Sequence, residues 1–472
     1  MRGKNAQSLA TNAACLAASR MLPRLLQIGY IVLLARNLGP ELYGLFVYGQ
    51  AWYLTLLPLT SFGIHLLLSK TIGTNPAAAP SILAYTLAFR VGVATGAALL
   101  SAGAAYVCEP EPLARTLLFV FSLALLGRAV VTWTEHAFVA FEAAHYALRC
   151  EVFFRLFESG VGILLLLSGG RVLPVAILHA LGWCLQAAAA LMIIHQQLAP
   201  IALRCTWHKA RELLAFGWPL SLNIFCIGFL LQGPMMLYRS LAPGELHIGQ
   251  MAVPLQAVAI LCLLPAAVST SALPVLARLG QSTGGKDVRV VEIMIRLGYG
   301  FGAIVGLIGL ALGPWLVEDI LGPRYATAGG LIGPALWLVI PYTCGNVLTS
   351  LALVRGSIHT VVACSAVGAL ALVAAIPLFT SWWGNTGVIV GMAVALSCWV
   401  GMLLAMGVCH ITVCVVRPLS WVCAALAMYI TLASHHKLLA LGVSLLTLLC
   451  TAPVLGIVQS QELRAIRQRY GI

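Results

Sequence analysis

Charged side chains are scarce in this 472-residue sequence. Only 9% of its residues are Asp, Glu, Lys or Arg, and 61% are hydrophobic. An average soluble domain has about a quarter of its residues charged. The composition therefore excludes an ordinary soluble domain and predicts a polytopic membrane protein. It also excludes a nucleic-acid-binding protein, because the positive net charge of +13 is not gathered on a basic soluble face or arm.

Patterns typical of metal sites, disulfides and cleaved signals are also missing. The 14 cysteines lie mostly in apolar stretches, with no CxxC pair and no histidine at a zinc-like spacing. We interpret them as small apolar packing residues and expect no metal, no disulfide and no cofactor. Arg20 and Arg24 interrupt the first apolar stretch, where a signal peptide needs an unbroken core. We therefore expect this first helix to be retained.

Long apolar runs are abundant in the sequence. A membrane span needs roughly 20 apolar residues, and breaking the chain at its polar and Gly/Pro punctuation predicts fourteen spans. The predicted spans are residues 9–35, 43–69, 80–106, 113–134, 152–169, 172–197, 213–232, 248–275, 289–313, 328–350, 358–379, 386–410, 418–434 and 438–458. The fifth span contains Arg155 and Glu158, and the thirteenth is short. If these are misjudged, the count falls to twelve.

The positions of lysine and arginine set the expected orientation. With the N-terminus inside, seventeen of the 27 basic residues lie toward the cytoplasm, four lie within the membrane and six lie outside. The six outer residues are Arg36, Arg115, Arg171, Arg239, Arg324 and Lys437. Because short cytoplasmic loops carry an excess of Lys and Arg, this bias predicts that both termini are cytoplasmic.

An internal repeat predicts how the spans are grouped. The run LARNLGPELYG at residues 34–44 recurs as LYRSLAPGELHIG at residues 237–249, with Arg36 corresponding to Arg239. Since six predicted spans separate the two copies, we expect two six-helix lobes, a common transporter plan. The predicted divisions are a first lobe at 1–200, a second lobe at 201–416, and a helix pair with a cytoplasmic tail at 417–472. The alternative is a chance likeness between two Gly/Pro-rich turns.

Four arginines lie inside predicted spans of the first lobe: Arg20, Arg24, Arg90 and Arg128. No comparable set of buried acids accompanies them. Charges in lipid are costly and mostly face a cavity, a partner or a substrate path. A guanidinium also matches the oxygens of a phosphate group. We therefore predict a carrier for an anion such as a pyrophosphate. The alternative is that these side chains extend to the membrane interface or cap buried carbonyls.

Other polar residues in the spans have weaker functional interpretations. Glu158 is a candidate for ion coupling, but Glu151 and Arg155 lie on the same helix and favour a local ion cluster. His65 and His179 are interpreted as hydrogen-bonded interior residues. Candidate contacts for sugar hydroxyls are Asn223, Gln232, Gln256 and Asn346, alongside Tyr342. Such groups also commonly hydrogen-bond between membrane helices.

Several motifs occur in an order that resembles a known family. They are Ala35 to Glu41 with Tyr43 and Gly44, Phe216 to Leu220, Leu273 and Pro274 with Arg278, and Ile320 to Pro323 with Tyr325 and Ala328. The chain is similar to the polysaccharide, or O-antigen, flippases of the multidrug/oligosaccharidyl-lipid/polysaccharide exporter superfamily. This resemblance implies an all-α bundle of two lobes around a central cavity. It also implies transport of an undecaprenyl-pyrophosphate-linked oligosaccharide across the cytoplasmic, or inner, membrane.

Three alternatives differ from that function. A peptidoglycan-precursor flippase and a multidrug antiporter belong to the same superfamily, although cationic drugs are better served by buried carboxylates. A membrane glycosyltransferase or polymerase is the enzymatic alternative, but the predicted outer connections are short and contain few acids. We therefore expect a non-enzymatic carrier. Its expected partners are the lipid-linked oligosaccharide, membrane lipids and polysaccharide-assembly enzymes.

Overall fold

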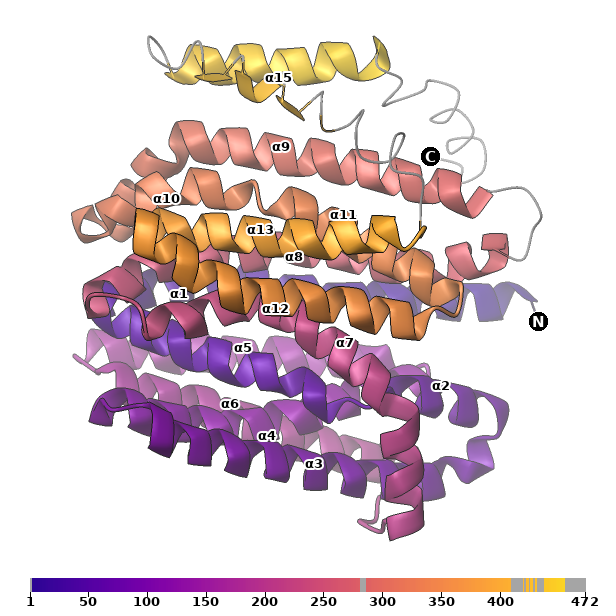
Figure 1. Cartoon of the computed structure of the whole chain (residues 1–472). Coiled ribbons are helices and arrows are strands. Elements are labelled where there is room, and N and C mark those ends of the chain that lie inside the picture. Colours follow the sequence, from indigo (N-terminus) through magenta and orange to yellow (C-terminus); the bar gives the residue numbers. More distant parts are fainter. Residues whose placement is uncertain are drawn as a thin grey trace. The chain divides into compact units, whose positions relative to one another are not determined.

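The computed structural model describes residues 2–280, 286–408 and 437–454, with a few residues between 419 and 430; side chains are described from residue 27 onward. Within these ranges every regular element is a helix (Figure 1). The all-α, multi-pass class predicted from the composition is confirmed. The chain divides into two compact units, Met1–Ala252 and Val253–Ile472.

The first unit contains most of the predicted candidate residues. Its elements are α1 (Arg2–Leu56), η1 (Leu57–Thr60), α2 (Ile64–Thr74), η2 (Pro76–Ala78), α3 (Ala79–Cys108), α4 (Pro112–Ala140), α5 (Ala144–Leu167), α6 (Val172–Ile193), η3 (Ile194–Leu198), α7 (Trp207–Arg239) and the start of α8 (Glu245–Gly280). Its core is rich in aromatic side chains. Phe121, for example, is fully buried and packs on Phe46 and Tyr53.

The second unit continues from α8 with further long helices. They are α9 (Lys286–Leu321), η4 (Pro323–Tyr325), α10 (Ala326–Leu336), α11 (Val339–Val354), α12 (Ile358–Trp383), α13 (Asn385–Ala405) and α15 (Lys437–Val454). The predicted division of the chain near residue 200 stays a prediction. By compactness alone, α7 groups with the first unit.

Thirteen of the fourteen predicted spans coincide with helices, and the thirteenth, at 418–434, lies largely outside the described residues. Within the described ranges, nine helical stretches are long and apolar enough to cross a membrane. A tenth is counted if 27–60 and 64–74, bent by 46°, form one span. Helix α5 is absent from that count because Arg149, Glu151, Arg155 and Glu158 interrupt its apolar character.

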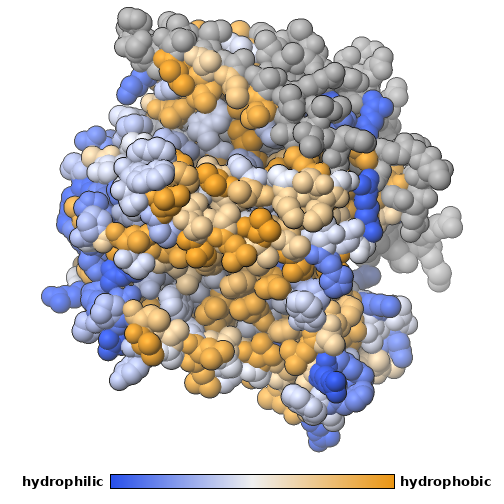
Figure 2. Space-filling view, viewed as in Figure 1, coloured by the Kyte–Doolittle hydropathy of each residue, from blue (hydrophilic) through white to orange (hydrophobic). Residues whose placement is uncertain are grey.

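The exposed surface fits a lipid environment. Large apolar side chains are widely exposed. Leu181 and Leu185 on α6 are about half exposed, and Leu370 on α12 is 69% exposed. Figure 2 shows apolar residues gathered over the middle of the helices and hydrophilic residues near their ends. Since soluble proteins rarely expose such broad apolar areas, these faces are suited to contact with acyl chains.

Glycine marks two places where the repeat motif shapes the first unit. Gly39 has a φ of 70° and interrupts the helical geometry of α1 between the first two predicted spans. Farther on, Gly44 meets Gly249 so closely that a Cβ on Gly249 would lie 1.8 Å from the carbonyl oxygen of Pro40. The two copies of the repeat thus pack against each other, and alanine has no space at this contact.

The predicted orientation can be tested by cysteine labelling in a cysteine-free variant. We expect positions beside Lys286 and Arg467 to react only from the cytoplasm, and positions beside Glu245 and Asn385 only from outside. The charge asymmetry of the loops is the physical reason. Labelling beside Arg467 from the outer side would contradict the even number of spans.

Candidate anion-binding site

Arg90 lies on α3 and is only 2% exposed. Its Nε donates to the carbonyl oxygen of Ala129 at 3.0 Å, and its Nη1 donates to the carbonyl oxygen of Thr60. Thr60 ends η1, just before the chain leaves helical geometry at Phe62 and Gly63, which both have positive φ. Non-helical backbone at membrane depth needs neighbouring groups to satisfy it. Arg90 provides them, which is the capping role considered from the sequence.

The same break is held from the other side by α7. The backbone N–H of Phe62 donates to Oγ of Ser221 at 2.6 Å, and a Cβ on Gly217 would lie 2.1 Å from the carbonyl oxygen of Phe62. The broken span is therefore fixed between α3, α4 and α7. One group remains available there, because Nη2 of Arg90 is buried and has no hydrogen-bond partner among the residues that the structure describes.

Arg128 on α4 is placed differently. Its Nη1 lies 3.8 Å from Oε1 of Glu135 and 3.7 Å from Oε2 of Glu151, and this nitrogen makes no hydrogen bond to the described residues. Its guanidinium carbon lies 3.9 Å from the ring centroid of Trp183. The side chain is 18% exposed. Since both ion pairs are longer than hydrogen bonds, Arg128 is the cation of this region best able to exchange partners.

The interpretation that the arginines within the spans lack accompanying acids is wrong for Arg128. Glu135, Glu151 and Glu158 lie in or at the edge of the same cluster, and Glu135 was missed because it sits near the end of a predicted span. A signal was present in the sequence: Arg128 and Glu135 are seven residues apart, so they lie on one helix face two turns apart.

Arg155 is at the centre of a buried network on α5 and α6. Its Nη1 donates to Oε2 of Glu158, its Nη2 donates to Oε1 of Gln186 at 3.1 Å, and its Nε lies 3.8 Å from Glu151. Gln186 in turn donates to Oε2 of Glu151 at 2.5 Å. The guanidinium carbon lies 3.7 Å from the ring of Trp183. Two guanidinium groups this close to one indole cannot share a face, so Trp183 separates Arg128 from Arg155.

His179 completes the network in its neutral form. Its Nε2 lies 3.1 Å from Nε1 of Trp183 and 3.1 Å from the hydroxyl of Tyr53. An indole N–H only donates, so Nε2 must accept and the ring proton sits on Nδ1. There it donates to Oε1 of Glu158 at 2.6 Å. Both oxygens of Glu158 are therefore used locally, and its candidate role in ion coupling stays untested.

The charges of this cluster balance. Arg90, Arg128 and Arg155 supply three positive charges, and Glu135, Glu151 and Glu158 supply three negative ones, with His179 neutral. Arg20 and Arg24 lie on α1, four residues apart and so on one helix face, but their side chains are outside the described part of the structure. The binding of an anion by these two arginines therefore stays a prediction.

The candidate sugar contacts lie in both units. Asn223 on α7 is 2% exposed, and its Oδ1 has no hydrogen-bond partner within the described structure. Gln232 lies half-buried on the same helix. In the second unit, Gln256 on α8 and Asn346 on α11 are half-buried, and the side chain of Asn346 contacts that of Tyr342. Asn223 thus retains a polar group able to bind a hydroxyl.

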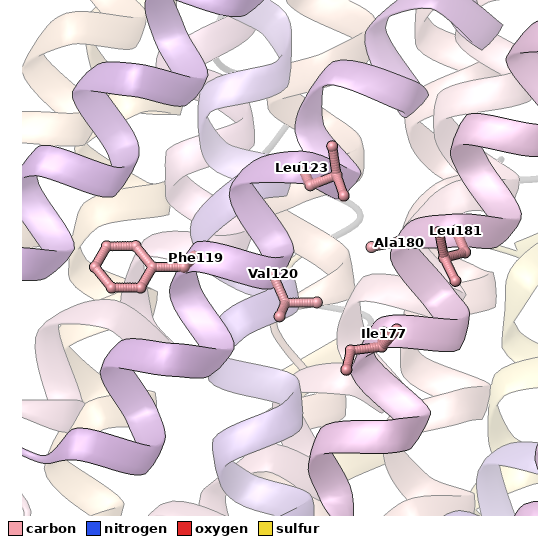
Figure 3. A pocket seen from close by; sticks show the side chains of 6 residues that line it. All are labelled: Phe119, Val120, Leu123, Ile177, Ala180 and Leu181. Atoms are coloured by element: carbon pink, nitrogen blue, oxygen red, sulfur yellow. The ribbon is translucent and has the colours of Figure 1, made fainter.

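A groove of about 280 Å³ between α4 and α6 does not contribute to this chemistry. Figure 3 shows its apolar lining. The lining residues are Phe119, Val120, Leu123, Ile177, Ala180 and Leu181. It carries no side chain able to bind an anion, and its partly exposed walls suit an acyl chain.

Solved structures define the fold class. The chain matches a multidrug resistance MATE family transporter of the MOP superfamily in an inward-facing conformation, with a TM-score of 0.63 and 12% identity, covering 84% of this chain and 98% of that one. It matches the lipid II flippase MurJ in an inward closed conformation with a TM-score of 0.64 and 13% identity, covering 93% and 98%. A MOP superfamily transporter from Pyrococcus furiosus matches with a TM-score of 0.57 and 14% identity, and the match covers 85% of this chain and 94% of that one. The fold is that of the MOP superfamily transporters.

The sequence itself identifies the family. Residues 9–280, more than half of the chain, match the family described as polysaccharide biosynthesis protein, and the chain belongs to it. No curated protein sequence matches this chain. The family resemblance inferred from the motifs is confirmed. The matched region contains Arg20, Arg24, Arg90 and Arg128.

Proposed function

We propose that this protein is a flippase that moves an undecaprenyl-pyrophosphate-linked oligosaccharide across the cytoplasmic membrane by alternating access. The observation that carries the proposal is the family match over residues 9–280, which includes the four arginines predicted to lie within the spans of the first lobe. A lipid-linked glycan precursor is a cargo consistent with polysaccharide biosynthesis, and its pyrophosphate needs cationic donors. The protein acts as a carrier rather than a catalyst.

Arg20 and Arg24 provide the primary pyrophosphate contacts in this proposal. Arg128 joins them by exchanging Glu135 and Glu151 for phosphate oxygens, because its present ion pairs are long. Arg90 contributes through its unpartnered Nη2 while its other nitrogens continue to cap Thr60 and Ala129. The sugar contacts are Asn223 and Gln232 in the first unit, and Gln256 and Asn346 in the second. Assembly enzymes of the same pathway are the proposed protein partners in the inner membrane.

A peptidoglycan-precursor flippase is the second candidate. The lipid II flippase structure covers 93% of the chain, more than the two other structures described above, and the candidate cationic contacts suit either pyrophosphate-linked cargo. The two candidates differ in the glycan and therefore in the cellular defect that follows loss of the protein.

Depletion of the protein in its own host distinguishes these functions. We expect the lipid-linked oligosaccharide to accumulate in the inner leaflet, surface polysaccharide to disappear, and cell-wall synthesis to continue. The measurement is the fraction of oligosaccharide that a glycan-binding reagent reaches from each side of sealed vesicles. Arrest of cell-wall synthesis with lipid-linked peptidoglycan precursor accumulating would favour the second candidate. Altered drug susceptibility with normal glycan export would contradict both.

A further inference from the structure

Arg239, at the end of α7, lies among three carboxylates. Its Nη2 is 3.0 Å from Oε1 of Glu109 and 2.6 Å from Oε2 of Glu111, and its Nη1 is 2.7 Å from Oε1 of Glu245. The side chain is 14% exposed, and that of Glu109 is 5% exposed. At these distances the contacts are charge-assisted hydrogen bonds in a partly desolvated place, so they are stronger than exposed surface pairs.

The four residues come from parts of the chain that the repeat assigns to different lobes. Glu109 and Glu111 lie in the connection between α3 and α4, whereas Arg239 and Glu245 end α7 and begin α8. Tyr48 on α1 adds a further tie, since the guanidinium carbon of Arg239 lies 5.8 Å from its ring centroid. All these ends lie on the side predicted to face outward.

The cluster lies beside the closest backbone contact between the two repeat copies. Tyr48 follows Gly44 by one turn, and Gly249 follows Glu245 by one turn; Gly44 and Gly249 are the pair that meets without space for a Cβ. Separating α1 from α8 at this end therefore requires both the glycine contact to open and the ion pairs to break.

The two copies of the repeat use their arginine differently. Arg36, the counterpart of Arg239 in the first copy, is exposed. Turn chemistry alone would apply to both copies equally, so it does not explain why the second arginine is nearly buried and bound to three acids. The chain thus supplies its own matched control residue.

We propose that Arg239, with Glu109, Glu111 and Glu245, forms an ionic latch that holds the outer end of the transport pathway closed and is broken when the protein opens outward. The latch rests on the proposed alternating-access function. Arg239 is a gating residue and makes no contact with cargo in this scheme. Removing Arg239 is expected to make the interior of the protein more accessible from the outer side of the membrane.

The test uses a single cysteine at Val47→Cys in a cysteine-free variant. Val47 is 3% exposed and lies three residues after Gly44, on the same helix face and one turn deeper. In whole cells, Arg239→Gln is expected to raise its labelling rate by a membrane-impermeant maleimide roughly tenfold, because the outward-open population grows when the latch contacts are lost. Arg239→Lys should restore part of the protection, since it keeps the charge.

Arg36→Gln is the matched control and should label at the parent rate. The proposal is overturned if Arg239→Gln labels at the parent rate, or if Arg36→Gln raises labelling equally. Should Arg239→Gln fail to accumulate in the membrane, Glu109→Gln carries the same expectation and the same refutation. Accessibility is measured without reference to cargo. If Arg239→Gln raises labelling in a protein that exports no oligosaccharide, the latch proposal stands and only the proposed substrate is refuted.

Discussion

Alanine at Arg24 is expected to stop export of the lipid-linked oligosaccharide while leaving the amount of protein in the membrane unchanged. Glu135, Glu151 and Glu158 are balanced in number by Arg90, Arg128 and Arg155, so the charge of this cluster does not require a cation on α1. An arginine retained inside a span without such a structural demand is best explained by an anionic ligand. Losing a desolvated charge contact typically costs about 2 to 5 kcal/mol of binding.

Other substitutions at Arg24 separate charge from geometry. Lysine should rescue export partly, because it restores the charge without the planar fork of donors. Glutamate should be worse than alanine, because it repels a ligand that is already negative. The measurement is the lipid-linked oligosaccharide held in the inner leaflet, alongside the protein content of the membrane. Arg36→Ala on the outer turn is the control and should export normally.

Arg90 is expected to behave differently from Arg24. Alanine there removes the donor to the carbonyl group of Thr60 at the helix break, at a cost of about 1 to 3 kcal/mol for a buried group. Both export and the amount of folded protein should therefore fall. Normal export by well-expressed Arg24→Ala and Arg20→Ala variants would refute the anion site. A matching loss of protein in all three variants would instead make these arginines structural.

The sequence predicts the helices well because each span is a local property of composition. Gly39 and Pro40 punctuate the first two spans, and the backbone leaves helical geometry at Gly39. The break at Phe62 and Gly63 is harder to foresee. It depends on Arg90 and Ser221, which lie on other helices and satisfy the exposed backbone groups there.

Pairings between helices account for most of what the sequence alone does not reveal. The local spacing of Arg155 and Glu158 predicts their ion pair. The position of Trp183 between Arg128 and Arg155 depends on the relative rotation of α4, α5 and α6, and no local pattern encodes that rotation. Arg239 and Glu109 meet across 130 residues for the same reason. Single-sequence patterns therefore identify which polar residues are unusual, but not which of them satisfy one another.

The second large effect is expected at Glu158, where glutamine should strongly destabilise the protein. Glu158 is 2% exposed, and its two oxygens bind Nδ1 of His179 and Nη1 of Arg155. An amide keeps one acceptor but turns an N–H group toward another donor, and it leaves the charge of Arg155 less compensated. Removing one partner of a buried ion pair typically costs about 3 to 5 kcal/mol. The measurement is the free energy of unfolding in mixed micelles.

Glu212→Gln provides the control for that measurement. Glu212 also pairs with a cation, since its Oε2 lies 3.2 Å from Nζ of Lys209, but both side chains are about half exposed. Exposed pairs contribute at most about 1 kcal/mol. The contrast between the two substitutions therefore isolates the effect of burial from the loss of a carboxylate.

The same substitution decides between the structural and ion-coupling interpretations of Glu158. A coupling cation would have to displace Arg155 or the proton that neutral His179 donates, and Trp183 keeps that proton on Nδ1. The network is thus arranged to retain its internal partners, and the structural interpretation predicts a loss of stability with no change in the ion dependence of the remaining transport. A Glu158→Gln protein that unfolds like the parent, yet exports independently of Na⁺ and H⁺ gradients that drive the parent, would overturn this interpretation and assign coupling to Glu158.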